Sequence, residues 1–229
     1  MVSAAEMLQA YARGIFPMAE SRADSELHWV DPRRRGIIPL DGFHLSRSLR
    51  RRILRWPHAI RIDTAFHAVV TACGAREETW INEPLVRIYG ELHALGAAHS
   101  LEVFSGDRLV GGVFGVVLGG AYFGESMFSA ETDASKVALA YLVARLRAGG
   151  FTLFDTQFLT PHLKRMGGIE IPREDYRRRL ADALKVAADF AAPGQPPDPS
   201  SLVASLSAAA SSSGAAAVSG SRQRSTQTS

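Results

Sequence analysis

The chain contains very little cysteine and very little lysine. Cys73 is the sole cysteine among 229 residues, so the sequence excludes an intrachain disulfide and a cysteine-based metal site. This usage fits a reducing cytosol. Three of the 26 basic residues are lysines (Lys136, Lys164 and Lys185), and the others are arginines, which favour planar contacts with phosphate or carboxylate. Genome composition alone produces the same bias.

Long apolar runs are also missing. No stretch reaches the roughly 18 apolar residues that a membrane-spanning helix needs. Residues 1–10 lack the basic start and apolar segment of a signal peptide. We therefore expect a cytoplasmic protein without a membrane partner. With 46% hydrophobic residues and a net charge of +3, the chain is long enough for one sizeable core and a small second domain.

The last part of the chain lacks aromatic residues and has almost no charge. Residues 191–229 consist mainly of Ala, Ser, Gly, Pro and Thr. Such a segment buries too little apolar surface to offset the entropy of ordering it. We expect a disordered tail over 191–229.

Residues 1–57 read as a small N-terminal domain. A short helix is expected over Ala4–Ala12, and a basic amphipathic helix over Arg47–Arg55, ended by Pro57. Five arginines surround the apolar stripe of the second helix: Arg47, Arg50, Arg51, Arg52 and Arg55. An arginine run of this kind is either a solvated face or a surface that binds phosphates.

Residues 58–190 have the pattern of a mixed α/β domain. Strands are expected over 59–63, 100–105, 108–118, 120–124 and 151–158, of which the middle three form an antiparallel group. Helices are expected over 64–74, 83–95 (capped by Asn82), 134–148, 161–166 and 173–190. The domain is predicted to be α/β with a mixed sheet.

Polar side chains interrupt two apolar strands of this domain. Asp155 and Gln157 share one face of the strand 151–158, because alternate residues of a strand point the same way. Glu125 ends a glycine-rich apolar run. Burying such groups unpaired costs roughly 1–3 kcal/mol each, so they either have partners or contact a ligand. The sequence predicts a small-molecule or acyl-transfer site at these residues.

A series of short motifs runs in order from about residue 7 to 180. The motifs are Tyr11-Ala-Arg-Gly14-Ile-Phe16-Pro17-Met18, Trp29-x-x-Pro32-x-x-Arg35, Ser46-Arg47-Ser48, Thr79-Trp80-Ile81, Ala98-His99-Ser100-x-Glu102, Leu109-Val110-Gly111-Gly112-x-x-Gly115, Gly124-Glu125-Ser126-Met127-Phe128-Ser129, Ala134-Ser135-Lys136 and Asp155-x-Gln157. Together these motifs resemble the leucyl/phenylalanyl-tRNA–protein transferase family.

The resemblance implies a bacterial cytosolic monomer that uses no metal and no organic cofactor. Such an enzyme moves Leu or Phe, and sometimes Met, from Leu-tRNA or Phe-tRNA to an N-terminal Arg or Lys of a protein. The product is marked for degradation by the N-end rule. The implied fold is a small N-terminal domain followed by a domain like the GNAT acetyltransferases, with a mainly antiparallel sheet.

The same resemblance implies roles for the polar strand residues. Asp155 and Gln157 form the catalytic pair, in which Asp155 orients the Gln157 amide and the amide oxygen contacts the attacking amine. A proton relay through Gln157 and substrate-assisted proton transfer both stay open. Glu125 would pair with the cationic group of the acceptor protein, or else serve as a structural partner of a turn.

The donor amino acid and its tRNA need further contacts. Expected members of the apolar aminoacyl pocket are Val113, Tyr122, Met127, Leu142 and Phe154, each of which also suits an ordinary core. Trp29 and Trp80 would stack on the terminal adenosine, which is worth about 1–3 kcal/mol per base, or belong to the core. The five arginines would meet acceptor-stem phosphates. Lys136 would neutralise a phosphate or pair with Glu125 or Asp155.

Two other functions compete with aminoacyl transfer. A GNAT acetyltransferase needs a glycine-containing loop for the pyrophosphate of CoA, and residues 127–136 contain no glycine. A non-catalytic RNA-binding module would explain the arginines and tryptophans but leaves Glu125, Asp155 and Gln157 without a purpose.

Overall fold

A mixed, mainly antiparallel sheet of seven strands forms the centre of the molecule, as expected. The computed structural model describes residues 2–24, 26–55 and 59–209. The strand order is β4-β5-β6-β7-β8-β3-β9, with β7 and β8 parallel and the other neighbouring pairs antiparallel. These strands are β3 (Arg34–Ile37), β4 (Ala59–Ile62), β5 (Ala98–Ser105), β6 (Arg108–Leu118), β7 (Ala121–Ser129), β8 (Leu153–Gln157) and β9 (Ile169–Pro172).

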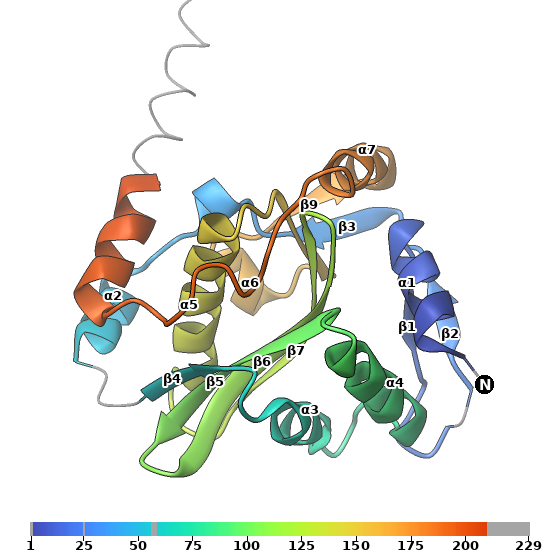
Figure 1. Cartoon of the computed structure of the whole chain (residues 1–229), viewed down its shortest axis with the longest axis horizontal. Coiled ribbons are helices and arrows are strands. Elements are labelled where there is room, and N and C mark those ends of the chain that lie inside the picture. The colour runs from blue at the N-terminus through green and yellow to red at the C-terminus, as the bar shows by residue number, and fades with distance from the viewer. Residues whose placement is uncertain (1, 25, 56–58, 210–229) are drawn as a thin grey trace, which may run out of the picture.

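Helices cover both faces of this sheet (Figure 1). Figure 1 shows α5 (Ala134–Ala148) on one side of β5–β7, with α3 (Phe66–Gly74) and α4 (Glu83–Ala94) on the other. Alternation along the strands supplies the two apolar layers. Val113 and Tyr122 belong to the core on the α5 side, whereas Phe114 and Phe123 belong to the core on the side of α3 and α4.

The helix starts that depend on local capping are confirmed. Ser3 and Glu6 form a capping box at α1 (Ala4–Ala12), and Asn82 accepts a hydrogen bond from the Leu85 N–H at α4. Ser46 caps the basic helix α2 (Arg47–Leu54) through the Leu49 N–H. Polar N-caps of this kind satisfy amide groups that have no acceptor within the helix. The helix α6 (Pro161–Arg165) also forms where expected.

Several short strands were not expected from the sequence. These are β3, β9 and the separate two-stranded sheet of β1 (Phe16–Met18) and β2 (His28–Val30). They are three or four residues long, too short for an alternating pattern to stand out. The strand expected over 120–124 continues to Ser129 as β7, because β6 pairs with its whole length.

The last long helix ends earlier than expected. The structure gives α7 as Arg173–Ala183, although the periodic pattern predicted a helix to Phe190. Beyond α7 the chain turns back, and the Phe190 ring stacks on His99 with 4.3 Å between ring centroids. Phe190 is 3% exposed. The chain leaves the helical path after Ala183, and the path that it takes instead buries the Phe190 ring in the core.

The expectation of a disordered tail is wrong for its first half. Residues 199–209, the C-terminal helix, place Leu202, Val203 and Leu206 in the same core as α5. Asp198 accepts hydrogen bonds from the Ser200 and Ser201 N–H groups at the helix start. The apolar side chains of this helix bury enough surface to order the segment, although its composition is of low complexity. Residues 210–229 of the predicted tail lie outside the described residues.

The segment predicted as an N-terminal domain contributes to the main sheet. Its strand β3 lies between β8 and β9 and pairs with both. The division at residue 57 stays a prediction. Within the described residues, none of the helices combines the length and apolarity that crossing a membrane requires.

Candidate active site

The candidate site lies where the two parallel strands separate. The paired register of β7 and β8 runs from Ala121 and Leu153 to Phe123 and Asp155. Glu125 and Gln157 each lie two residues beyond the last pair, Glu125 at a register shift of β7 and Gln157 at the end of β8. The structure therefore brings the three predicted polar residues together from segments that lie about 30 residues apart in the sequence.

Asp155 is fully buried in an ion pair with Arg35. The Arg35 guanidinium donates two hydrogen bonds to the carboxylate, at 2.9 and 2.6 Å, and the Tyr176 hydroxyl donates a third at 2.7 Å. Arg35 is 1% exposed and lies between the rings of Phe16 and Tyr176. Burial acts to lower the pKa of Arg35, but the neighbouring Asp155 carboxylate outweighs burial, so the pKa of Arg35 is raised above its usual value.

Gln157 adopts an unusual backbone conformation that Asp155 supports. Its φ angle is +62°, in the left-handed region that side-chain-bearing residues rarely adopt. The Gln157 N–H donates to Asp155 Oδ1 at 2.8 Å. The side-chain amide does not meet Asp155, contrary to expectation. Instead its Nε2 donates to both oxygens of Glu125 at 3.2 Å.

Glu125 accepts hydrogen bonds from two tyrosines as well as from Gln157. Tyr11 donates to one carboxylate oxygen at 2.8 Å and Tyr89 to the other at 2.7 Å. Burial raises the pKa of Glu125 to about 7, although the three donors oppose the shift. Because these donors already use both oxygens, Glu125 is suited to orient the Gln157 amide. The amide oxygen of Gln157 then remains as the acceptor for an incoming group.

A cavity of about 240 Å³ adjoins this network. Of the five predicted pocket residues, Val113, Met127 and Phe154 line it, together with Leu139 and Leu163. Tyr122 and Leu142 do not; both are fully buried in the core on the α5 side. Tyr122 packs against Gly115, where a Cβ atom would lie 2.5 Å from the ring. Because Gly115 has no Cβ atom, the core has room for the Tyr122 ring, and the ring does not line the cavity.

The two predicted stacking residues occupy different environments. Trp80 lines the cavity beside Glu125 and Gln157. Trp29 lies on β2 of the small sheet, is 42% exposed and does not line the cavity. Trp80 is thus placed to contact a molecule in the cavity, whereas Trp29 offers a ring at the surface.

The basic helix α2 carries all its predicted arginines on the surface. Arg47, Arg50, Arg51, Arg52 and Arg55 are exposed, and Leu49 and Ile53 face the core. Arg52 lies 3.5 Å from Asp133. Lys136, for which three partners were open, pairs with Asp133 at 2.6 Å and not with Glu125 or Asp155.

Comparison with known proteins identifies the family. The model of the family described as leucyl/phenylalanyl-tRNA protein transferase matches residues 37–181, and the model of its N-terminal domain matches residues 1–33. This chain belongs to the leucyl/phenylalanyl-tRNA protein transferase family. The predicted resemblance is therefore confirmed, and the chain is an aminoacyltransferase.

Curated relatives carry the same family name. A Cereibacter sphaeroides leucyl/phenylalanyl-tRNA–protein transferase is 67% identical over 86% of this chain and 92% of its own length. A Ruegeria sp. relative is 60% identical over 85% of this chain and 93% of its own length. Among solved structures, FemX matches with a TM-score of 0.51 and 13% identity, covering 73% of this chain and 66% of FemX. That likeness supports the fold alone.

Four residues of the transferase network had no predicted role. Tyr11, Arg35, Tyr89 and Tyr176 hold Glu125 and Asp155, yet their contacts span 114, 120, 36 and 21 residues of sequence. Tyr11 and Arg35 lie within the motifs that identified the family. For Tyr89 and Tyr176, the sequence offered one clue: each places a hydroxyl group on the apolar face of a helix, where it needs a buried hydrogen-bond partner.

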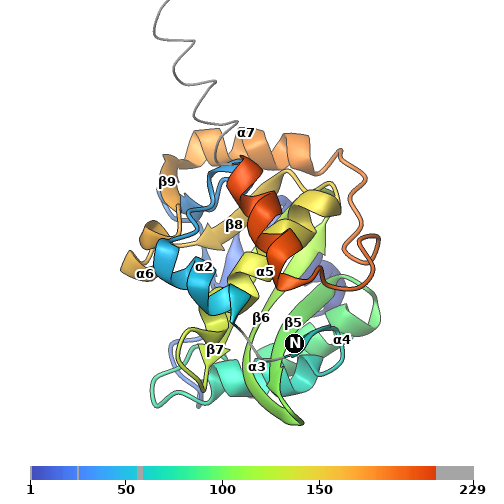
Figure 2. The ribbon, with the colours of Figure 1, turned by 90° about the vertical axis from the view of Figure 1, so that its left-hand side faces the viewer.

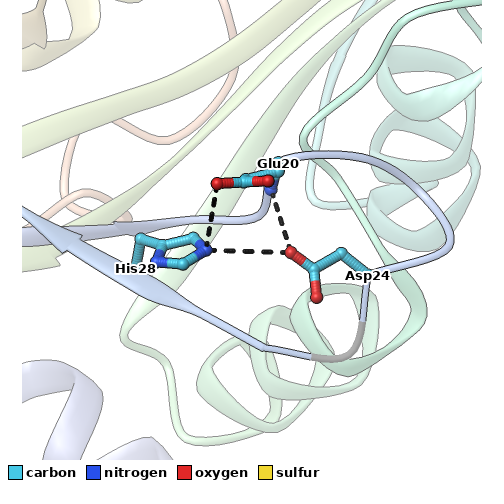
Figure 3. Close-up of side chains that lie close together, drawn as sticks. All are labelled: Glu20, Asp24 and His28. Atoms are coloured by element: carbon cyan, nitrogen blue, oxygen red, sulfur yellow. Dashed lines mark hydrogen bonds and ion pairs between the residues drawn. The ribbon is translucent and has the colours of Figure 1, made fainter.

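One group of side chains has the composition of a metal site. Figure 3 shows Glu20 and Asp24, from the connection between β1 and β2, converging with His28, the first residue of β2. His28 Nε2 lies 3.7 Å from a Glu20 oxygen and 3.8 Å from an Asp24 oxygen. Glu20 and His28 are exposed, and none of the three lines the cavity beside Gln157. We interpret the group as a polar cluster at the surface.

Proposed function

We propose that this transferase moves Leu or Phe, and sometimes Met, from aminoacyl-tRNA to the N-terminal Arg or Lys of a protein. The observation that carries the proposal is the Gln157 amide, fixed by buried Glu125 at the wall of an apolar cavity. The cavity suits the donor side chain, and the amide oxygen of Gln157, which has no hydrogen-bond partner among the described residues, suits the attacking amine. The products would be substrates for N-end-rule degradation.

The reaction is the aminolysis of an ester. The α-amine nitrogen of the acceptor forms a bond to the aminoacyl carbonyl carbon, and the bond from that carbon to the ribose oxygen breaks. The amine loses a proton, and the ribose oxygen gains one. An aminoacyl ester is already activated, so holding the amine and the ester in line supplies much of the rate.

Gln157 acts on the reacting atoms in this scheme. Its amide oxygen accepts a hydrogen bond from the α-amine and aims the nitrogen lone pair at the ester. Asp155 and Glu125 act through Gln157: Asp155 holds its backbone N–H and Glu125 holds its side-chain amide. An amide is not a base, so we assign the proton transfer to the substrates, from the amine to the leaving ribose oxygen.

The donor would bind with its side chain among Val113, Met127 and Phe154. Unbranched and γ-branched side chains enter such a cavity more easily than β-branched ones, and flexible Met127 adapts to both Leu and Phe. We propose that Trp80 stacks on the terminal adenosine and that Trp29 contacts the RNA from the surface. The arginines of α2 would meet acceptor-stem phosphates. One chain supplies the whole cavity, so we propose a monomer that acts in the cytoplasm, where charged tRNA is available.

Transfer of radiolabelled Leu from Leu-tRNA tests the proposal directly. The acceptors are two proteins that differ only in an N-terminal Arg or Ala. We expect label on the Arg protein alone, and a loss of turnover of about 100-fold in Gln157→Asn, because the attacking amine is no longer positioned. Asparagine tolerates the left-handed backbone but is too short to reach Glu125, so this variant separates chemistry from backbone strain.

Thr152→Ala, an exposed position just before β8, is the matched control and should keep full turnover. Equal labelling of both acceptors would contradict the acceptor rule. Normal turnover in Gln157→Asn would contradict the role of Gln157.

A further inference from the structure

A second cavity, of about 360 Å³, lies beside the first. The two cavities share helices α5 and α6 as a common wall. On α5, Lys136 lines the second cavity and Leu139 the first; on α6, Arg165 lines the second and Leu163 the first. The opposite wall is the start of α2, at Ser46 and Ser48. Figure 2 shows α2, α5 and α6 grouped on one side of the molecule.

The lining of this second cavity is basic. Lys136 and Arg165 supply two positive charges, and Asp133 is the single acid among the lining residues. Asp133 pairs with Lys136 at 2.6 Å and with Arg52 at 3.5 Å, so the three cations Lys136, Arg165 and Arg52 exceed the one acid and leave a net positive charge. Burial lowers the pKa of His162 in the same wall, and the charges of Lys136 and Arg165 lower it further. The cavity therefore presents a positive potential and neutral donors.

The α2 side adds groups that suit an anion. The Ser46 and Ser48 hydroxyls lie 3.1 Å apart at the first turn of this helix. The first N–H groups of an α-helix have no acceptor within the helix, and its N-terminal end carries a partial positive charge. His162 Nε2 is buried without a hydrogen-bond partner among the described residues. The Leu49 N–H already donates to Ser46 Oγ, so one of the two hydroxyls and His162 Nε2 are the groups left to donate hydrogen bonds to phosphate oxygens.

We propose that this second cavity binds a backbone phosphate of the single-stranded 3′ end of tRNA. The inference rests on the proposed function, which places the terminal aminoacyl group in the first cavity and the acceptor stem on the α2 arginines. A strand that joins these two places must pass α5 and α6, where the second cavity lies. The cavity would fix the path of the strand and so the position of the ester beside Gln157.

Filter binding of two RNAs tests this assignment. The probes are an intact tRNA and the same tRNA without its single-stranded 3′ end, and the variant is the double substitution Lys136→Ala, Arg165→Ala. We expect the variant to bind intact tRNA about an order of magnitude more weakly, with a reduced salt dependence, and to bind the shortened tRNA as the wild type does.

The matched control is Lys164→Ala, Lys185→Ala. It removes the same charge from exposed lysines on α6 and at the end of α7, neither of which lines the cavity. We expect it to bind both RNAs as the wild type does. If the Lys136→Ala, Arg165→Ala variant bound both RNAs more weakly to the same extent, the proposal would be overturned, because the two residues would then attract RNA in general. Unchanged binding of intact tRNA would overturn it as well.

Two further outcomes separate this inference from the proposed function. If the wild type binds no tRNA at all, the proposed function fails and the inference fails with it. If CoA raises the melting temperature of the wild type but not of the Lys136→Ala, Arg165→Ala variant, the second cavity binds a phosphate of CoA instead. That result would overturn the assignment to tRNA.

Discussion

The buried network around Gln157 and the basic surface of α2 use charge in opposite ways. In the network, Arg35 and Asp155 are almost completely buried, and each carboxylate oxygen of Asp155 and Glu125 has a hydrogen-bond partner. On α2 and at Arg55 directly after it, five arginines are exposed to water. Buried charges fix geometry because any unpaired group is costly. Exposed charges attract a polyanion from a distance and contribute little individually to folding.

Removing one partner of the buried Arg35–Asp155 ion pair should have the largest effect on the stability of the fold. Arg35→Ala leaves the Asp155 carboxylate buried without its ion-pair partner, so the free energy of unfolding should fall by about 3–5 kcal/mol. Its neighbour Arg34, whose side chain is 59% exposed, is the matched control, and Arg34→Ala should change stability by less than about 0.5 kcal/mol. Urea unfolding measures both. Similar small losses in the two variants would show that burial does not distinguish these arginines.

A pH series examines the same network through Glu125. Burial raises the pKa of Glu125 from 4.5 to about 7, so between these values the folded protein holds a proton that the unfolded chain releases. The free energy of unfolding should therefore fall as the pH rises through this window, by about 3 kcal/mol in all.

Glu125→Gln removes the titrating group, so its stability should vary less with pH than that of the wild type. Urea unfolding at several pH values between about 4 and 8 measures the difference. Parallel stability curves for the two proteins would contradict the raised pKa. Transfer activity should fall below about pH 7 in the wild type, because a protonated Glu125 no longer accepts all three hydrogen bonds.

The C-terminal helix supports α5, which borders both cavities. Ending the chain after residue 190 removes the buried Leu202, Val203 and Leu206, worth about 5 kcal/mol in gross terms, partly offset by the entropy of ordering the segment. We expect a net loss of about 2 kcal/mol, with transfer activity retained below the melting temperature. A chain ended after residue 209 is the control. A large loss of activity at unchanged stability would instead assign the segment a direct role.

The sequence carried the local features of this fold better than its long-range contacts. Polar caps such as Asn82 and the alternation around Asp155 act over a few residues, so α4 and β8 were predicted. The left-handed Gln157 was not, because it depends on Asp155 being held by Arg35, which is 120 residues away in sequence. The composition of residues 199–209 led to a wrong prediction of disorder, because the spacing of Leu202, Val203 and Leu206 allows a helix that packs on the core. Tyr122 was predicted to line the pocket, but its ring lies against Gly115 in the core, a contact that the sequence alone did not reveal.

Single arginines of α2 should show the smallest effects, visible in RNA binding and not in folding. Arg50→Ala should weaken tRNA binding by a few-fold and reduce the slope of log affinity against log salt by roughly one, because one phosphate contact is lost. Its effect on unfolding should stay within about 0.5 kcal/mol. Arg178→Ala, an exposed arginine on α7, is the control and should change neither quantity. If Arg50→Ala destabilised the fold as Arg35→Ala is expected to, the contrast between buried and exposed charge would not hold, because α2 would then depend on its arginines for packing.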